Sequence, residues 1–503
     1  MGLKAVASKI MAQWLVRSSK KWIENPEESQ QSTLQYLLRS AQNTSFGKDH
    51  NFTAIETHEQ YKKAVPIRDY EAHRHYIDRT LNGEKDVLWP GIPLYWSKTS
   101  GTTSGAKYIP ISKESIGHHI KAARNALLFY IHRTGNASFL DGKMIFLQGS
   151  PILEKKNGVN TGRLSGIVAH HVPAYLQKNR MPSWDTNCIE DWESKVDEVV
   201  RETRNEDMRL ISGIPSWVQM YFERLLTETN SSNIRELFPN FSLFVYGGLN
   251  YEPYRPIFEK LIGTKVDTVE TYPASEGFIA YQDLGEAEGL LLNLEANIFY
   301  EFIPLDEIHQ DSPSRLALWE VETGRNYAIL LSTNAGLWSY MIGDTVRFLS
   351  TRPYRIVVTG RTKHFISAFG EHVIAEEVEK AIKYAMDKSK AVVSEFHLAP
   401  QVSPKEGLPY HEWFVEFTDQ PEDHNRFAQD LDESLQEQNP YYRDLIAGNI
   451  LRRAVLRPCK QGTFVAYMKS AGRLGGQNKI PRLADNRKIA DELESINRND
   501  NPV

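Results

Sequence analysis

Hydroxyl, glycine and lysine side chains gather in one short stretch, WSKTSGTTSGAKYIPI, which begins at Trp96. Glycines let backbone N–H groups converge on an anion, hydroxyls donate hydrogen bonds to its oxygens, and Lys107 adds a positive charge. These are the groups that hold a polyphosphate. The stretch is not a P-loop, because Gly101 and Gly105 are only four positions apart and Tyr108 follows the lysine. Taken alone, a Ser/Thr/Gly-rich turn without a ligand explains the stretch equally well.

Three later motifs favour a nucleotide site. TYPASEG places Tyr272, Ser275 and Glu276 at the end of a predicted strand, YMIGDTVRF contains Asp344, and VVTGRT contains Arg361. A carboxylate for Mg²⁺, an acidic residue for the ribose hydroxyls and an aromatic ring beside the base are parts that an ATP site needs. Each motif alone is weak, since Glu276 could satisfy donors at a helix N-terminus and Asp344 could cap a turn. In this order along the chain, they together predict an ATP site.

Other catalytic classes find little support in the sequence. The pairs His118–His119 and His170–His171 lack partners at metal-ligand spacing, and neither an H-E-x-x-H motif nor a cysteine pair occurs. A G-x-S-x-G motif of serine hydrolases is also absent from the sequence. We therefore expect these histidines to be core or surface residues.

The composition is that of a globular protein, with 41% hydrophobic and 24% charged residues among 503. A formal net charge of −5 gives no reason to expect nucleic acid or an anionic membrane as a partner. No stretch of the sequence approaches the roughly 20 apolar residues of a membrane span. Two cysteines, Cys188 and Cys459, are too few for a disulfide framework and fit a reducing compartment, so we expect a cytoplasmic protein.

Two domains are expected to position the motifs, because the chain is too long for one ordinary core. In residues 1–360, short apolar runs such as KMIFLQGS, MRLIS and FSLFVYGG alternate with helical patterns. This alternation is typical of an α/β domain whose ligand loops follow the strands. After Gly289 the pattern becomes strand-rich and indicates a β-rich subdomain. In residues 361–503, a β-α-β-β-α-β order predicts a small α+β domain joined by a hinge.

Local patterns also predict individual elements. Ser112 is the expected N-cap of a helix that begins directly after the hydroxyl-rich stretch. Near the C-terminus, HEWFVEFT alternates as a strand does. At the N-terminus, helical spacing predicts a packed amphipathic helix, with an apolar face formed by Leu3, Val6, Ile10, Trp14 and Leu15.

The order of the motifs resembles that of the adenylate-forming enzymes, which include acyl-CoA synthetases, peptide-synthetase adenylation domains and luciferases. The closer match is the acyl acid–amido synthetase family, the auxin-responsive proteins of plants and their bacterial relatives. TSGTTSGAK resembles its first motif, YPASE its second and YMIGD its third, while GGQNKIPR is similar to its Lys-x-Pro-Arg stretch. Pro273 and His372 depart from the family pattern. The resemblance spans nearly the whole chain and implies a large adenylate-forming domain followed by a small mobile one.

The resemblance also implies roles for individual residues, with ATP and Mg²⁺ as ligands. Glu276 would ligate Mg²⁺, Asp344 would bind the ribose hydroxyls with help from Arg361, and Lys479 would reach the α-phosphate from the small domain. The phosphates would be held by Ser100, Gly101, Thr102, Thr103 and Lys107, and adenine would be flanked by Gly247, Gly248, Leu249 and Tyr272. Ser275 would also bind the nucleotide.

The sequence gives less information about the acyl pocket than about the nucleotide site. Arg124 lies on the helix after the phosphate-binding stretch and could pair with a substrate carboxylate. Trp217 and Tyr246 follow predicted strands, and they could line an apolar pocket. Ordinary packing or surface positions explain all three residues as well.

We therefore expect an enzyme that adenylates a small carboxylic acid with ATP and then joins the acyl group to an amino acid. An acid–CoA ligase with the same first step is the main alternative, because a pantetheine tunnel cannot be read from sequence. A nucleotide-binding regulatory protein without catalytic activity is the second alternative.

Overall fold

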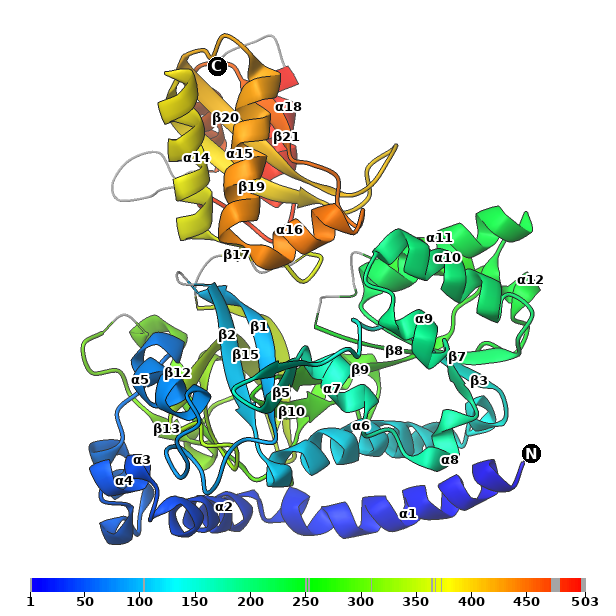
Figure 1. The fold of residues 1–503 in the computed structure, drawn as a ribbon, viewed down its shortest axis with the longest axis vertical. Coiled ribbons are helices and arrows are strands. Elements are labelled where there is room, and N and C mark those ends of the chain that lie inside the picture. The colour runs from blue at the N-terminus through cyan, green and yellow to red at the C-terminus, as the bar shows by residue number, and fades with distance from the viewer. Residues whose placement is uncertain are drawn as a thin grey trace. The chain divides into compact units, whose positions relative to one another are not determined.

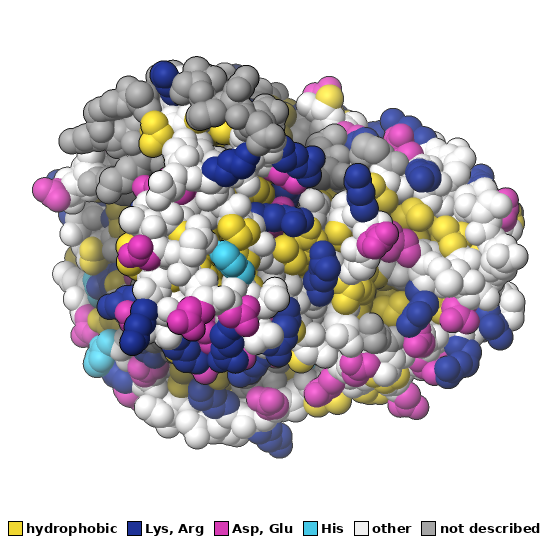
Figure 2. Space-filling model, turned by 90° about the horizontal axis from the view of Figure 1, so that it is seen from above, with side chains coloured by type: hydrophobic (Ala, Val, Ile, Leu, Met, Phe, Trp, Pro, Cys, Tyr) yellow, Lys and Arg dark blue, Asp and Glu magenta, His cyan; other side chains and the backbone are white. Residues whose placement is uncertain are grey.

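A computed structural model of the chain describes residues 2–498 except 103–104, 249–250, 252–253, 309, 363–364, 367, 372 and 472–479. The chain divides into two compact units. The first comprises Met1–Thr99, Lys107–Glu190 and Ser194–Thr362, and the second comprises Ser100–Ala106, Asp191–Glu193 and Lys363–Val503. Within the described ranges, no helix combines the length and hydrophobicity that crossing a membrane requires. On the face that Figure 2 shows, basic and acidic side chains are interspersed, as the small net charge leads one to expect.

Helices and strands alternate through the first unit, and its amino-terminal part is helical (Figure 1). The helices up to the centre of the chain are α1 (Leu3–Glu24), α2 (Pro26–Ala41), α3 (Ser45–Asp49), α4 (His58–Ala64), α5 (Tyr70–Leu81), α6 (Lys113–Thr134), α7 (Leu164–Ala169), α8 (Ala174–Gln177), α9 (Trp184–Cys188), α10 (Trp192–Thr203), α11 (Pro215–Thr229), α12 (Ile234–Leu237) and α13 (Arg255–Ile262). The strands are β1 (Tyr95–Thr102), β2 (Gly105–Ile111), β3 (Lys143–Phe146), β4 (Glu154–Lys156), β5 (Val159–Gly162), β6 (Arg180–Met181), β7 (Met208–Ser212), β8 (Leu243–Gly247), β9 (Asp267–Ala274), β10 (Gly277–Tyr281), β11 (Leu290–Leu292), β12 (Ile298–Pro304), β13 (Leu316–Ala317), β14 (Asn326–Thr333), β15 (Tyr340–Thr351) and β16 (Tyr354–Arg361).

A twelve-stranded sheet organises this unit, in the order β13-β12-β14-β15-β16-β11-β10-β9-β8-β7-β3-β6. From β6 to β9 the neighbouring strands are parallel, and from β9 to β13 they are antiparallel. The predicted α/β domain with a β-rich subdomain after Gly289 is therefore confirmed. In the parallel part, adjacent residues such as Leu210 and Ile211 are both fully buried, which explains why these strands are short apolar runs without alternation.

The helix after the hydroxyl-rich stretch begins where the sequence predicts. In α6, the Ser112 hydroxyl accepts a hydrogen bond from the Ser115 N–H, and the Ser115 hydroxyl accepts one from the Ser112 N–H, each at 2.9 Å. The Ser112 hydroxyl also donates to the Asn334 carbonyl at 2.7 Å. This cap fixes the start of α6, which then packs along β9 and β10, with α1 on its other side (Figure 1).

The expected apolar face of α1 is wrong. Leu15 is buried, but Val6, Ile10 and Trp14 are 46%, 65% and 66% exposed, and nothing is described of the Leu3 side chain. The buried face carries three small residues, one leucine and one tryptophan: Ala5, Ala12, Leu15, Ser19 and Trp22. Small side chains let α1 approach α6 closely, so close packing and not hydrophobic periodicity decides which face is covered.

The second unit is an α+β domain, as predicted. It contains β17 (Phe365–Ile366), β18 (Val373–Ile374), α14 (Ala375–Ser389), β19 (Val392–Gln401), β20 (Tyr410–Asp419), α15 (His424–Gln438), α16 (Pro440–Ala447), β21 (Val455–Cys459), α17 (Thr463–Ser470) and α18 (Lys488–Arg498). The predicted strand HEWFVEFT is β20, the centre of the sheet β19-β20-β21. Both of its faces are covered, because Phe417 packs on Phe427 of α15 while Phe414 shares a cluster with Phe464 of α17.

A buried ion pair ties the amino-terminal helices to the strands that precede the YMIGD motif. Glu301 on β12 accepts hydrogen bonds from Arg315 at 2.8 and 2.9 Å, and its carboxylate also lies 2.9 Å from His58. Burial alone would raise the pKa of Glu301, but the hydrogen bonds and charges of His58 and Arg315 outweigh it and lower that pKa. The Ser339 hydroxyl donates to the same carboxylate at 2.8 Å, so the network fixes the residue directly before β15.

Acid should destabilise this unit through His73. Burial lowers the pKa of His73 to about 3, and the Trp338 N–H donates to its unprotonated Nε2 at 3.4 Å. The folded-state pKa of His73 lies below the ordinary value of 6.5. The contribution of the neutral His73 ring to stability is therefore complete above pH 6.5 and is lost as the pH falls towards 3. Between pH 7 and pH 4, we expect a loss of about 3 kcal/mol from this residue.

Denaturation midpoints measured from pH 7 to pH 4 test this expectation. The variant His73→Gln keeps an acceptor for the Trp338 N–H but cannot titrate, so its midpoint should fall less steeply with acid. An equal decline in both proteins would contradict the assignment.

Candidate functional site

The second motif forms a tight turn at the junction of the parallel and antiparallel parts of the sheet. Ala274 pairs with Gly277 across the β9–β10 hairpin, which leaves Ser275 and Glu276 as the two turn residues. The Ser275 hydroxyl lies 2.8 Å from the Ser97 hydroxyl on β1, a strand of the separate sheet β2-β1-β5-β4. The turn therefore holds the half-buried Glu276 carboxylate at the tip of the hairpin, where the two sheets meet.

The second and third motifs meet through one hydrogen bond. The Tyr272 hydroxyl donates to a carboxylate oxygen of Asp344 at 2.5 Å, although the two residues are 72 positions apart. Tyr272 is 8% exposed and Asp344 is half-buried, so the carboxylate lies at the margin of the core. Two residues that the sequence predicts for the base and the ribose thus lie side by side.

An irregularity in β15 allows Asp344 to leave the regular ladder. Along the pair β14–β15, Ala328 lies opposite Thr345 while Leu330 lies opposite Met341, so β15 contains extra residues between these two points. Gly343, in this interval, has a φ of 93°, a conformation that favours glycine. Such a bulge re-aims a side chain, which is consistent with Asp344 pointing towards Tyr272.

The VYGG stretch ends β8 beside the same hairpin. A methyl group on Gly247 would lie 2.3 Å from the carbonyl oxygen of Thr271, the residue directly before Tyr272. The Thr271 hydroxyl donates to the Tyr246 carbonyl at 2.9 Å and holds the two strands together at this point. Gly247 is therefore needed for the close approach of β8 to β9, and Gly248 continues from it at the strand end.

The hydroxyl-rich stretch is the hairpin of β1 and β2. Ser100, Gly101 and Thr102 are the last residues of β1, and Thr103 lies outside the described residues. In β2, the Lys107 ammonium lies 5.8 Å from the centre of the Tyr70 ring. Burial raises the pKa of Tyr70 to about 12, so this ring is neutral at physiological pH.

Of three further predicted residues, one can be placed only in part and two lie outside the described residues. Arg361 lies opposite Asp344 in the pairing of β15 with β16, although its side chain is not described. Leu249 and Lys479 lie outside the described residues. Their predicted roles stay predictions.

The residues expected at an acyl pocket occupy different environments. Arg124 is exposed on α6, and its guanidinium lies 3.4 Å from the Asn125 side-chain oxygen. Trp217 is buried in α11. Tyr246 is buried in β8 among aromatic rings, 4.7 Å from the Tyr251 ring centre, and burial together with the charge of Glu270 raises its pKa. Tyr246 directly precedes the Gly247–Gly248 pair at the end of β8.

Mg²⁺ fits this site as an ion that arrives with nucleotide phosphates. The described parts of the chain contain no group of three His, Cys, Asp or Glu residues arranged to hold a metal. Mg²⁺ commonly takes one or two protein carboxylates together with phosphate oxygens and water, so a single turn carboxylate such as Glu276 suffices. An all-protein metal cage is not needed for this chemistry.

Sequence reasoning missed two residues that shape the site. Ser97 bonds to the turn residue Ser275, and Thr271 fixes β8 against β9. Ser97 lies within the quoted stretch, and strand alternation from it could have suggested an inward-facing hydroxyl. Thr271 carries no such signal, because its partner is a backbone carbonyl on another strand.

Substituting Gly247 tests the packing of the site. Gly247→Ala places a methyl group against the Thr271 backbone, so we expect a loss of about 1–3 kcal/mol in stability and weaker binding of AMP. Gly285→Ala is the matched control, because a methyl group there would meet nothing within 4 Å. Thermal denaturation and calorimetric titration with AMP measure both effects. Equal behaviour of the two variants would refute the close-approach explanation.

Comparison with known proteins identifies the family. Residues 16–188 match the GH3 family N-terminal domain, residues 291–361 its central domain and residues 376–488 its C-terminal domain. A curated relative, the jasmonoyl–L-amino acid synthetase JAR4 of Nicotiana attenuata, is 23% identical over 63% of this chain. That match covers 66% of the relative, just under two thirds of its length.

Solved structures share the fold over almost the whole chain. The GH3.15 acyl acid amido synthetase in complex with 2,4-DB covers 96% of both chains with a TM-score of 0.62 at 17% identity. A 2-hydroxyisobutyryl-CoA ligase covers 94% of this chain and 92% of its own with a TM-score of 0.60 at 13% identity. Because its three domains match in order along the chain, the chain belongs to the GH3 family.

Proposed function

We propose that this protein is an ATP-dependent acyl acid amido synthetase. It adenylates a small carboxylic acid, releases pyrophosphate and then transfers the acyl group to the amine of an amino acid. The observation that carries this proposal is the Tyr272–Asp344 hydrogen bond, which brings the second and third nucleotide motifs together beside the Glu276 turn. The names of the relatives, such as jasmonoyl–L-amino acid synthetase, support the same chemistry.

The two steps follow from the chemistry of carboxylates. An amine does not attack a free carboxylate readily, because attack would build a second negative charge on it. In the first step, a carboxylate oxygen attacks the α-phosphorus of ATP and the bond to pyrophosphate breaks, giving a mixed anhydride. In the second step, the amine attacks the acyl carbon, AMP leaves with the bonding electrons, and the amine loses a proton. Both steps need the charges on the phosphates to be offset.

The residues of the site have separate roles in this proposal. Asp344 accepts hydrogen bonds from the ribose hydroxyls, and the Tyr272 hydroxyl orients that carboxylate while its ring lies beside the base. Gly247 and Gly248 leave room for adenine at the end of β8. Glu276 would hold Mg²⁺, which supplies positive charge to the phosphates when it is bound. The phosphate contacts fall to Ser100, Gly101, Thr102, Thr103 and Lys107, with Lys479 acting in the first step.

The second domain serves the order of events in this proposal. Residues 361–503 form the small domain, and residues 1–360 form the large one. A small domain that changes position could present Lys479 during adenylation and a different surface during amide formation.

Both cysteines, Cys188 and Cys459, are free thiols, which agrees with a cytoplasmic location.

An acid–CoA ligase is the second candidate function. The fold agrees with that of a 2-hydroxyisobutyryl-CoA ligase almost as closely as with that of an amido synthetase, with TM-scores of 0.60 and 0.62. The two functions share the first step and differ in the acceptor. An experiment that offers both acceptors separates them.

A panel of carboxylic acids, incubated with ATP and Mg²⁺, should show acid-dependent release of pyrophosphate. Adding the twenty amino acids should give an amide that mass spectrometry detects, whereas CoA should give no thioester. Thioester formation with no amide from any amino acid would favour the ligase. If no acid causes pyrophosphate release, the result would favour a nucleotide-binding regulatory protein without catalytic activity.

Charge-removing variants test the two carboxylates. Glu276→Gln and Asp344→Asn keep the shapes of the side chains but weaken the metal and ribose contacts. We expect each to slow adenylation at least about a hundredfold, the usual effect of losing one charge-stabilising group. Glu288→Gln, at an exposed position of the same strand-rich region, should have no effect. Pyrophosphate exchange at saturating ATP and Mg²⁺ measures the rates, and near wild-type activity of both site variants would refute the assignment.

A further inference from the structure

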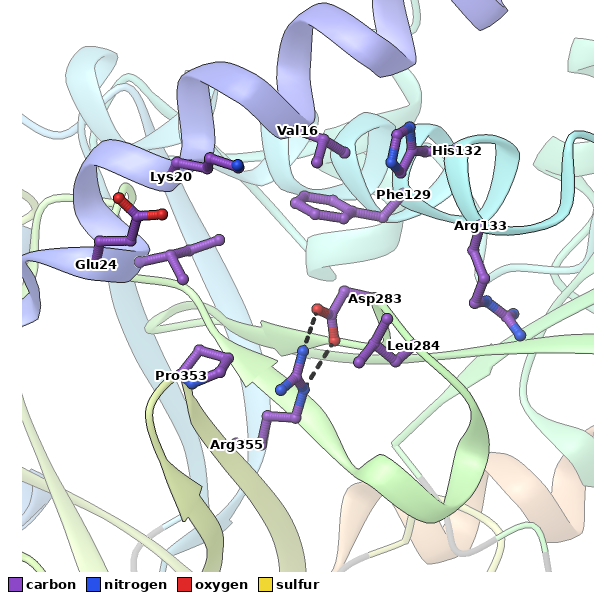
Figure 3. Close-up of a pocket in the computed structure, with 11 residues that line it drawn as sticks. Val16, Lys20, Glu24, Phe129, His132, Arg133, Asp283, Leu284, Pro353 and Arg355 are labelled. Carbon is purple, nitrogen blue, oxygen red and sulfur yellow. Dashed lines mark hydrogen bonds and ion pairs between the residues drawn. The ribbon is translucent and has the colours of Figure 1, made fainter.

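A pocket of about 350 Å³ lies in the first unit, at the opposite strand ends from the candidate nucleotide site (Figure 3). Four segments enclose it: the second half of α1, the end of α6, the loop after β10 and the turn between β15 and β16. Its apolar lining comes from Val16, Ile23, Phe129, Leu284 and Pro353. A volume of this size holds a small organic molecule, and the apolar lining favours a hydrocarbon chain or ring.

Positive charge surrounds the apolar part of the pocket. Lys20 from α1 and His132 and Arg133 from α6 line it, and all three are exposed (Figure 3). Among the described residues, neither Lys20 nor Arg133 forms an ion pair, and the Arg133 guanidinium lies 5.7 Å from the centre of the Tyr130 ring. Both cations are therefore available to an anion that enters from solvent.

The pocket also contains a buried ion pair. Arg355 on β16 donates to Asp283 at 2.6 Å, and both side chains are about nine-tenths buried. Because these two groups neutralise each other, the charge offered to a ligand comes from Lys20 and Arg133, with Glu24 opposing them. With histidine neutral, the lining carries one formal positive charge in excess.

We propose that this pocket is a second binding site, for a small apolar monocarboxylate. One excess positive charge matches a carboxylate, whereas the two negative charges of a phosphate monoester would exceed it and would meet Glu24 and Asp283. Lys20 and Arg133, which lie on opposite sides of the pocket in Figure 3, attract the carboxylate, and the hydrocarbon part contacts Phe129 and Leu284. Burial of the hydrocarbon supplies most of the affinity, and the cations select the acid over its neutral amide.

The pocket shares its walls with the elements that position the candidate nucleotide site. β10 begins next to Glu276 and leads to Asp283, while β16 begins at the pocket and ends at Arg361, opposite Asp344. Six residues of extended strand separate Arg355 from Arg361, which corresponds to about 20 Å. α6 likewise begins directly after its cap Ser112 and ends at Thr134, next to Arg133. A ligand in the pocket therefore contacts the far ends of three elements that carry the site.

Isothermal titration of the whole chain with 4-fluorophenylacetate tests the proposal, with 4-fluorophenylacetamide as the neutral comparison. The double variant Lys20→Glu/Arg133→Glu reverses both cations, and Arg17→Glu/Lys21→Glu reverses two exposed cations of α1 that do not line the pocket. We expect the first variant to bind one molecule of acid fewer per chain than the control, or that molecule at least about tenfold more weakly. The amide should bind the wild-type pocket more weakly by a similar factor.

A second variant covers the case in which charge reversal disturbs folding. Leu284→Trp, at a loop position that is 39% exposed, fills the pocket without changing charge and should also remove one bound acid. Unchanged stoichiometry and affinity in both pocket variants would overturn the proposal. Binding is measured without ATP, so the two proposals can fail separately. A protein that binds the acid in this pocket but releases no pyrophosphate would contradict the proposed function and would still support the second binding site.

Discussion

The hydrogen bond between Tyr272 and Asp344 requires the large sheet to curl. In the strand order, β9 and β15 are separated by β10, β11 and β16, so a flat sheet would hold them four spacings apart, or roughly 19 Å. The two side chains meet at 2.5 Å, so these strands must approach each other at one end. β11, with three residues, is short enough to let its neighbours bend around it. The candidate site therefore forms only when the parallel and antiparallel parts of the sheet are both folded.

This constraint explains why the functional residues come from distant segments. The parallel part supplies Gly247 and Thr271, the antiparallel part supplies Asp344, and the hairpin between them supplies Glu276. The second sheet joins through the bond between the Ser97 and Ser275 hydroxyls. The other ends of β10 and β16 lead to Asp283 and Arg355, whose buried ion pair lines the pocket beside α1 and α6.

Sequence predicted the features that depend on neighbours along the chain. The alternation of β7, α11, β8, α13 and β9, the Ser112 cap and the position of TYPASEG at a strand end are all local patterns. The buried face of α1 was predicted wrongly. Val6, Ile10 and Trp14 have the spacing of an apolar helix face, but they are exposed. Ala5 and Ala12 are buried instead, because their small side chains allow close packing. The resemblance of the motifs to those of a known family indicated which residues share a site. The contacts between these residues depend on the curvature of the sheet, which cannot be read from a short sequence pattern.

The buried network around Glu301 contributes to geometry more than to stability. A buried ion pair loses much of its attraction to desolvation, so Arg315 and Glu301 are weak grounds for expecting a large stabilisation. The network nevertheless joins α4, β12 and the start of β15, since Arg315 donates to the Val65 carbonyl at 2.6 Å and Ser339 donates to Glu301 at 2.8 Å. These hydrogen bonds hold the three segments together. With the chain fixed at Ser339, directly before β15, the bulge at Gly343 can direct Asp344 to Tyr272. The chemistry of the site therefore depends on the register of this strand.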